Sequence, residues 1–120
     1  MSLFDSTQLA LEAAMRGATL RQTLLTDNLA NVDTPGYQRR DVDFHATLRA
    51  AEASEASGAT LDDLAFSPQT DATRTVRADG SGVDADQESA ALAENSLDYQ
   101  ALVQVDSTRN SILQTAIGVR

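Results

Sequence analysis

The sequence lacks cysteine, lysine and tryptophan, and only 4% of its 120 residues are aromatic. Without cysteine the chain forms no disulfide, thiol nucleophile or cysteine-based metal site. Large aromatic side chains supply much of the burial energy of a compact core, and this chain has only three Phe and two Tyr. We therefore expect one elongated domain with a thin core that is completed by neighbouring copies.

Long apolar runs and positive charge are also scarce. No run of about 18 apolar residues occurs, so we expect no membrane insertion. The first residues, Met1 to Ser6, have no basic region followed by an apolar one, so we expect no cleaved secretory signal. Nine Arg stand against 18 Asp and Glu, a net charge of −9, and this negative field argues against nucleic acid as a partner.

Groups that carry chemistry are few. The one histidine, His45, has no evident nucleophile beside it, so we predict no catalytic residue, no bound cofactor and no enzymatic activity. Asp79, Asp84, Asp86 and Glu88 cluster near two glycines, but their spacing does not fit a calcium-binding EF-hand loop. A solvated acidic turn is favoured, and no metal site is predicted. Arg39-Arg40 is expected to donate a salt bridge to an acidic neighbour.

The chain divides into three segments: 1–33 and 87–120 are predicted helical, and 34–86 is irregular. The first helix runs from about Ser6 to Asn31, with Asp5 or Ser6 as its N-cap. One apolar stripe contains Leu11, Ala18 and Leu25, and a second contains Leu9, Ala13, Leu20 and Leu24. Because two stripes cover much of its circumference, this helix is expected to have partners on more than one side.

The second helix runs from about Asp86 to Ile117 and carries a heptad pattern. One row holds Leu92, Tyr99, Asp106 and Leu113, and its companion holds Leu102, Arg109 and Ala116. Gly118 is the expected C-terminal cap. The fold class is therefore mainly α, with two long terminal helices that pair as a coiled-coil-like unit. The pairing could be antiparallel within one chain or could occur between subunits.

The middle segment is polar and mixed. Residues 73–77 and 79–83 flank an Asp-Gly turn signal and could form a short β-hairpin.

Polar residues crowd the end of the first helix. The helix dipole favours cations there, yet Asp27, Asn28 and Asn31 occupy the last turns. In one interpretation Asn31 simply ends the helix and Asp27 is solvated. In the other, the side-chain amides hydrogen-bond a neighbouring helix end or turn. Pro35-Gly36 suits the centre of a type II turn.

The stretch Ala30-Asn31-Val32-Asp33-Thr34-Pro35-Gly36-Tyr37 resembles the N-terminal signature of the flagellar rod and hook family. Arg40-Asp41-Val42-Asp43-Phe44 after the turn, the short length and the stretch from Leu92 to Gln104 are similar to its short proximal rod members. About 70 of the residues take part in this resemblance.

The resemblance implies a structural subunit of the proximal rod in the cell-envelope or periplasmic space. Such a subunit self-assembles through its terminal helices into the torque-transmitting drive shaft used for motility. The implied partners are other copies of the chain, other rod proteins, the adaptor between rod and membrane ring, and the flagellar type III export apparatus. The implied subunit-interface residues are Leu11, Ala18, Leu25, Asn28, Asn31, Thr34, Pro35, Gly36, Tyr37, Leu92, Tyr99, Leu102 and Leu113.

Two alternatives accompany this hypothesis. Phe44 and Leu48 fit the Phe-x-x-x-apolar pattern that early flagellar export substrates present to the export gate, but residues one helical turn apart also simply pack. The heptad spacing alone also allows a cytosolic coiled-coil regulator or an export chaperone. A small enzyme would need convergent polar groups, which the sequence does not offer.

Overall fold

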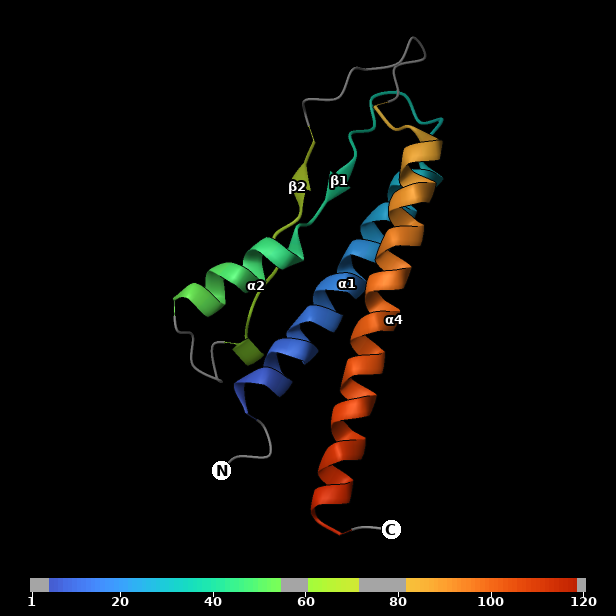
Figure 1. Ribbon diagram of the computed structural model, residues 1–120. Helices are drawn as coiled ribbons and strands as arrows, with labels where there is room; N and C mark the ends of the chain where they lie inside the picture. The colour runs from blue at the N-terminus through green and yellow to red at the C-terminus, as the bar shows by residue number, and fades with distance from the viewer. Residues whose placement is uncertain (1–4, 55–60, 72–81, 119–120) are drawn as a thin grey trace.

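The computed structural model describes residues 5–54, 61–71 and 82–118. Its elements are α1 (Ser6–Ala30), β1 (Arg40–Asp41), α2 (Phe44–Ala53), β2 (Gln69–Thr70) and α4 (Ala85–Ala116). The molecule is long and thin, 62 × 32 × 16 Å. Figure 1 shows α1 and α4 side by side and antiparallel, with α2 and the strands on one flank. The prediction of a mainly α fold with paired terminal helices is confirmed, and the pairing is within one chain.

Both long helices begin and end as their sequences predict. The Asp5 carboxylate accepts the backbone N–H of Gln8 and caps α1. The Asp84 carboxylate does the same for α4, accepting the N–H groups of Asp86 and Gln87. After α4, Gly118 adopts φ +75°, the left-handed conformation of a C-terminal glycine cap.

The turn after α1 reverses the chain at Pro35-Gly36. The Tyr37 N–H donates to the Thr34 carbonyl oxygen at 3.2 Å, and Gly36 has φ +77°. This is the predicted type II turn, which needs a residue with positive φ at its third position. It sends β1 back along the flank of α1.

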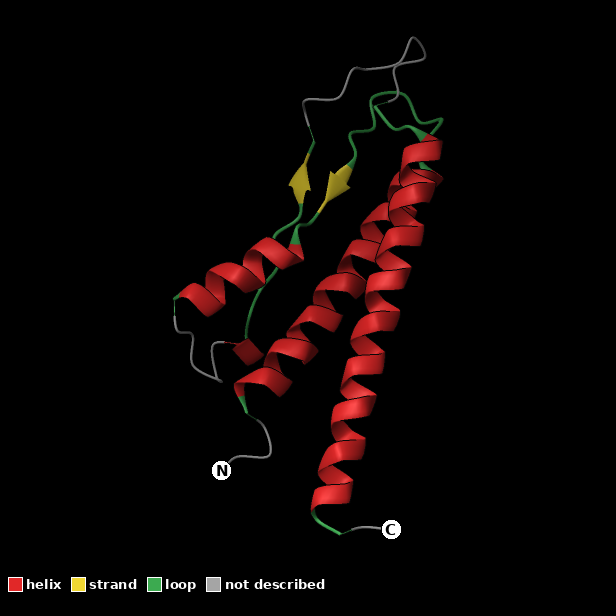
Figure 2. Cartoon of the chain, in the orientation of Figure 1, coloured by secondary structure: helices red, strands yellow, loops and turns green. Residues whose placement is uncertain are grey.

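The middle segment contains more regular structure than expected. Strands β1 and β2 pair antiparallel, with Arg40 opposite Thr70 and Asp41 opposite Gln69 (Figure 2). The two strands of this sheet precede and follow α2 in the sequence. The predicted hairpin at 73–83 lies largely outside the described residues. Helix α2, where an irregular chain was expected, begins at Asp43, whose carboxylate accepts the Ala46 N–H.

Helix α2 is held by a close contact at Gly17. Phe44 is 1% exposed and lies over Gly17 in the middle of α1. A Cβ at Gly17 would lie 2.5 Å from the Phe44 Cβ and 2.8 Å from its Cγ. Only glycine lets the two helices approach this closely.

Replacing Gly17 by alanine is expected to destabilise the subunit by about 1–3 kcal/mol, the typical cost of overpacking. Alanine in an open helix position would instead stabilise it, so the sign of the change reports the contact. Urea unfolding followed by circular dichroism measures it, with the exposed position Thr23→Ala as the control. Unchanged or greater stability in Gly17→Ala would show that α2 does not pack here.

Candidate functional site

The polar end of α1 clamps the start of β1. The Asn28 side chain is fully buried; its Nδ2 donates to the Arg40 carbonyl oxygen at 2.7 Å, and its Oδ1 accepts the Arg40 N–H at 2.9 Å. The Tyr37 hydroxyl donates to the same Oδ1 at 3.1 Å. The Asn28 amide therefore bonds the turn and strand that follow the helix, as the second interpretation states. Asn31 ends the helix, where its Nδ2 donates to the Asp27 carbonyl oxygen and its Oδ1 accepts the Thr34 hydroxyl of the turn.

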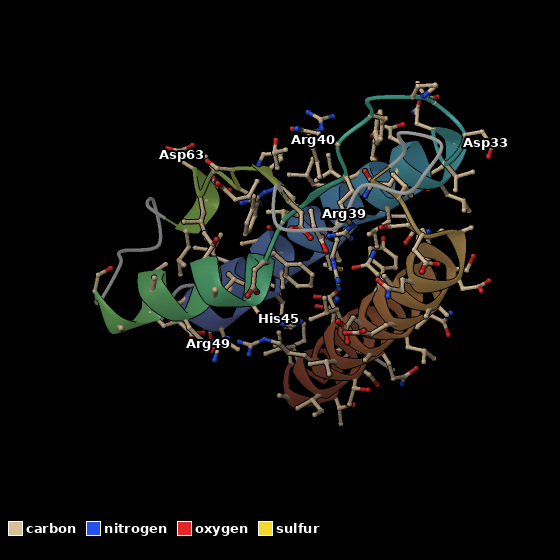
Figure 3. The ribbon with its side chains drawn as sticks, turned by 90° about the horizontal axis from the view of Figure 1, so that it is seen from above. Asp33, Arg39, Arg40, His45, Arg49 and Asp63 are labelled. Atoms are coloured by element: carbon tan, nitrogen blue, oxygen red, sulfur yellow. The ribbon has the colours of Figure 1, made fainter. Side chains whose placement is uncertain are left out.

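A buried ion pair joins this clamp to α4. Glu88 is 0% exposed, and the Arg39 Nε donates to its Oε1 at 2.5 Å. The Asn28 Nδ2 donates to the other carboxylate oxygen at 3.3 Å. Figure 3 shows Arg39 between α1 and α4. The predicted salt bridge from the Arg39-Arg40 pair is thus confirmed for Arg39.

Arg39 is the common partner of several carboxylates. Its guanidinium also lies 3.4 Å from Asp41 and 3.5 Å from Asp71. Burial alone would lower the pKa of Arg39, but the hydrogen bond and charge of Glu88, helped by Asp41, outweigh it and raise that pKa. The cation therefore stays charged and holds β1, the segment after β2 and α4 at one point.

Polar contacts continue down the seam between α1 and α4. The Asn95 Nδ2 donates to the Ala18 carbonyl oxygen and to the Gln22 Oε1, both at 2.9 Å. Further down, the Gln8 Nε2 donates to Asp106 at 2.9 Å. At the bottom, Arg109 forms an ion pair with Asp5. The α4 side of the seam is therefore largely polar.

Sequence reasoning missed the two most buried residues of this seam. Glu88 and Asn95 extend the predicted Leu102–Arg109 row upward in steps of seven, but both are polar. Buried polar groups need partners, and here the partners lie on α1 and β1. The unbroken seven-residue spacing was the signal that could have found them.

Several large apolar side chains of α4 are exposed instead. Its two buried residues are Glu88 and Asn95, whereas Leu97 is 66%, Val105 52% and Ile112 63% exposed. At about 3.6 residues per turn, Leu97 lies opposite the seam, and Val105 and Ile112 lie on one flank of it, each within about one turn of Arg109. A second exposed stripe, beside the seam, contains Tyr99, Val103 and Ile117.

The lower half of α4 also carries few charged side chains. From Tyr99 to Ile117 the only charged residues are Asp106 and Arg109, and both are engaged by α1. The upper half, by contrast, exposes acids such as Asp86 and Glu94. In a chain of net charge −9, the lower half is the surface on which another copy meets least repulsion.

The predicted interface residues fall into three groups. Ala18, Leu25 and Asn28 are buried inside the subunit, so the structure gives them intramolecular contacts. The tip of the turn and part of α4 are exposed: Thr34, Pro35, Gly36 and Tyr99. The remaining residues are half-buried along the helices and the turn: Leu11, Asn31, Tyr37, Leu92, Leu102 and Leu113.

The residues of the export-gate hypothesis lie on α2. Phe44 is buried against Gly17, and Leu48, one turn later, is half-buried. In the folded subunit they pack, as the simpler interpretation states.

His45 and the two arginines of the neighbouring cleft are engaged by carboxylates. The His45 Nε2 lies 3.3 Å from Asp98 on the surface. The arginines of the cleft beside it, Arg21 and Arg39, are both ion-paired. Within residues 5–54, 61–71 and 82–118, no three His, Asp or Glu side chains gather in a metal-binding arrangement. Over the same ranges, no helix is long and apolar enough to cross a membrane.

Known proteins are similar in sequence to this chain over nearly its whole length. Residues 10–38 match the family described as flagella basal body rod protein. The flagellar basal body rod protein FlgB of Bacillus subtilis (strain 168) is 32% identical over 98% of this chain and 97% of its own length. FlgB of Cereibacter sphaeroides is 36% identical over 81% and 82%, respectively, and FlgB of Escherichia coli (strain K12) is 35% identical over 67% and 70%.

Glu88→Gln is expected to destabilise the subunit by about 3 kcal/mol, because removing one member of a buried ion pair leaves the other poorly compensated. The matched control is Glu94→Gln. The Glu94 side chain is 70% exposed and 3.9 Å from Arg21, so its loss should change the free energy of unfolding by less than about 1 kcal/mol. If the two substitutions changed the urea midpoint equally, Glu88 would not form a stabilising buried ion pair with Arg39.

The pKa of Asp5 is lowered by the N–H of Gln8 and then by Arg109. A lowered carboxylate pKa stabilises the folded state above the unfolded value of 3.8, and that contribution is lost as pH falls through the folded pKa. An NMR titration of the Asp5 carboxyl carbon should therefore give a midpoint below 3.8. In Arg109→Gln the midpoint should rise yet stay below that value, because the Gln8 bond remains. An unchanged midpoint would mean that Arg109 does not reach Asp5.

Proposed function

This chain belongs to the FlgB family of flagellar basal body rod proteins, and from that membership we propose that it self-assembles through the outward faces of its terminal helices into the drive shaft that transmits torque. Membership of this family makes the chain a structural subunit of the basal-body rod. That membership favours a rod subunit over the coiled-coil regulator or export chaperone that heptad spacing alone allowed.

The observation that carries this proposal is the inverted polarity of α4. Its two buried residues, Glu88 and Asn95, are polar, whereas its large apolar side chains Leu97, Val105 and Ile112 are exposed. Exposed apolar side chains gain about 25 cal/mol for each Å² that association removes from water. Helix α1 contacts the polar side of α4, so the exposed apolar area is available to other subunits.

The geometry of the two stripes favours an array over a dimer. Leu97 lies opposite the seam, Val105 and Ile112 lie on one flank of it, and Tyr99 and Val103 lie on the other. One neighbour cannot cover both faces of a helix. A subunit with two divergent contact faces builds open or ring-like assemblies, as a rod requires.

The three segments act in this proposal as one elongated unit. The terminal segments 1–33 and 87–120 form the contacts along the shaft, and the segment 34–86 lies on their flank. The exposed tip of the turn, Thr34 to Gly36, is a contact for adjacent subunits. Other rod proteins and the adaptor to the membrane ring are the further partners, and the role is structural, without catalysis.

Export belongs to the same proposal. The chain would leave the cytoplasm through the flagellar type III apparatus without a cleaved signal. Phe44 is buried once α2 packs on α1, so the export gate would engage Phe44 and Leu48 before that packing forms. Export and folding would then exclude each other.

Val105→Asp is expected to prevent assembly while leaving the isolated subunit folded, because the Val105 side chain is 52% exposed in the subunit. Burying an unpaired carboxylate at a subunit contact is costly. The measurement is complementation of a strain deleted for this chain, with electron microscopy of its basal bodies and assays of motility.

Ser89→Asp is the matched control, because it adds the same charge to the acidic upper half of α4. It should restore rods and motility, and circular dichroism should show both variants equally helical. Complete rods built from the Val105→Asp subunit would exclude the exposed stripe of Leu97, Val105 and Ile112 as an assembly contact.

A further inference from the structure

The lower end of α4 continues past its partner. Among the described residues, Arg109–Asp5 is the lowest ion pair between α4 and the start of α1. Residues 110–117 lie beyond it and are called the overhang here; Figure 1 shows α4 extending below the start of α1. The overhang carries no charged side chain, and its Ile112 and Ile117 are 63% and 70% exposed.

A groove of about 670 Å³ lies higher on the same molecule, between α2, the first half of α1 and α4. It is called the α2 groove here. Its apolar lining comes from Ala10, Leu11, Ala14, Leu48 and Leu102. Two alanines one turn apart leave room for the backbone of another helix to approach closely.

The rim of the α2 groove carries one cation, Arg49, and two carboxylates, Asp43 and Glu52. Asp43 is engaged as the N-cap of α2, and Arg49 is the group that can meet a helix C-terminus. Arg49 lies on this rim and forms no ion pair with the described residues; its Nε donates only to the His45 carbonyl oxygen, at 3.4 Å. The last turn of α4 contains no basic residue. The partial negative charge at its carbonyl end is therefore uncompensated and favours a cation from elsewhere.

The overhang cannot enter the groove of its own subunit. Leu102 of α4 lines that groove, and the overhang begins eight residues further along the same straight helix, running away from it. The occupant must come from another molecule, and a second copy supplies an uncharged apolar helix end that the net charge of −9 does not oppose.

We propose that the overhang of one subunit docks in the α2 groove of the next, with Ile112 near Leu48 and the α4 carboxyl end near Arg49. The proposal rests on the self-assembly proposed above and names its contact. Two different surfaces meet, so the contact is heterologous and leaves a free groove and a free overhang at the ends. Copies joined in this way form an open chain with a direction.

The contact is expected to be weak when it acts alone. Two helical turns bury much less than the about 800 Å² per partner of a standard interface. Single subunits should therefore stay monomeric in dilute solution, and a covalent trap is needed to detect the pair.

Cysteine cross-linking gives a clean test, because the natural chain has no cysteine. Purified Ile112→Cys and Leu48→Cys subunits are mixed and treated with a short bismaleimide, and each is also treated alone. Arg49→Cys, on the exposed rim, replaces Leu48→Cys if that variant loses helicity. Asp33→Cys, at the far end of α1 (Figure 3), is the control acceptor.

The expected result is a mixed dimer of Ile112→Cys with Leu48→Cys and none with Asp33→Cys. The double variant should give a ladder of longer products. Adding Arg49→Ala to the acceptor should lower the yield about two- to fivefold, the size of one helix-end charge interaction.

Two results would overturn the proposal in distinguishable ways. Dimers of Ile112→Cys with itself, without the mixed product, would mean that like surfaces meet; self-assembly would stand and the groove assignment would fail. A protein that stays monomeric in sedimentation at every concentration, with no cross-linked product from the double variant, would remove self-assembly and the groove together.

Discussion

The Glu88 carboxylate is taken fully out of water, and much of the structure is arranged to make that possible. A buried charge is tolerated only when it is paired and hydrogen-bonded, and Arg39 and Asn28 meet both needs. Those two residues are fixed in turn by the reversal after α1, since Asn28 also holds the backbone of Arg40. The signature turn, β1 and the start of α4 are therefore positioned by one polar cluster.

Polar contacts between α1 and α4 specify register more than they add stability. Each such contact replaces hydrogen bonds to water, and its net gain is about 1 kcal/mol. Asn95 and Asp106, however, reach their partners on α1 only when the two helices have the observed relative position along their axes. The subunit thus fixes the relative position of its two helices while keeping much of its apolar area for other molecules.

Periodicity, caps and the turn could be predicted from the sequence because each depends on residues close together in the chain. The Asp5 cap, the Pro35-Gly36 turn and both long helices are of this kind. The seven-residue spacing could place Glu88 in the seam, but its partners Asn28 and Arg39 could not be predicted, because they are 60 and 49 residues away. For the same reason Leu25 was assigned to an interface between subunits: an apolar stripe does not say which molecule covers it.

The smallest dimension of the molecule is 16 Å, about a quarter of its 62 Å length. So thin a body has a small interior, whose largest fully buried apolar side chains are Phe44, Leu25 and Val83. In the proposed assembly, contacts between subunits would add to the stability of each folded subunit, so the melting temperature would depend on subunit concentration. Heat resistance would then be greatest where a subunit is surrounded on all sides and smallest at the growing end.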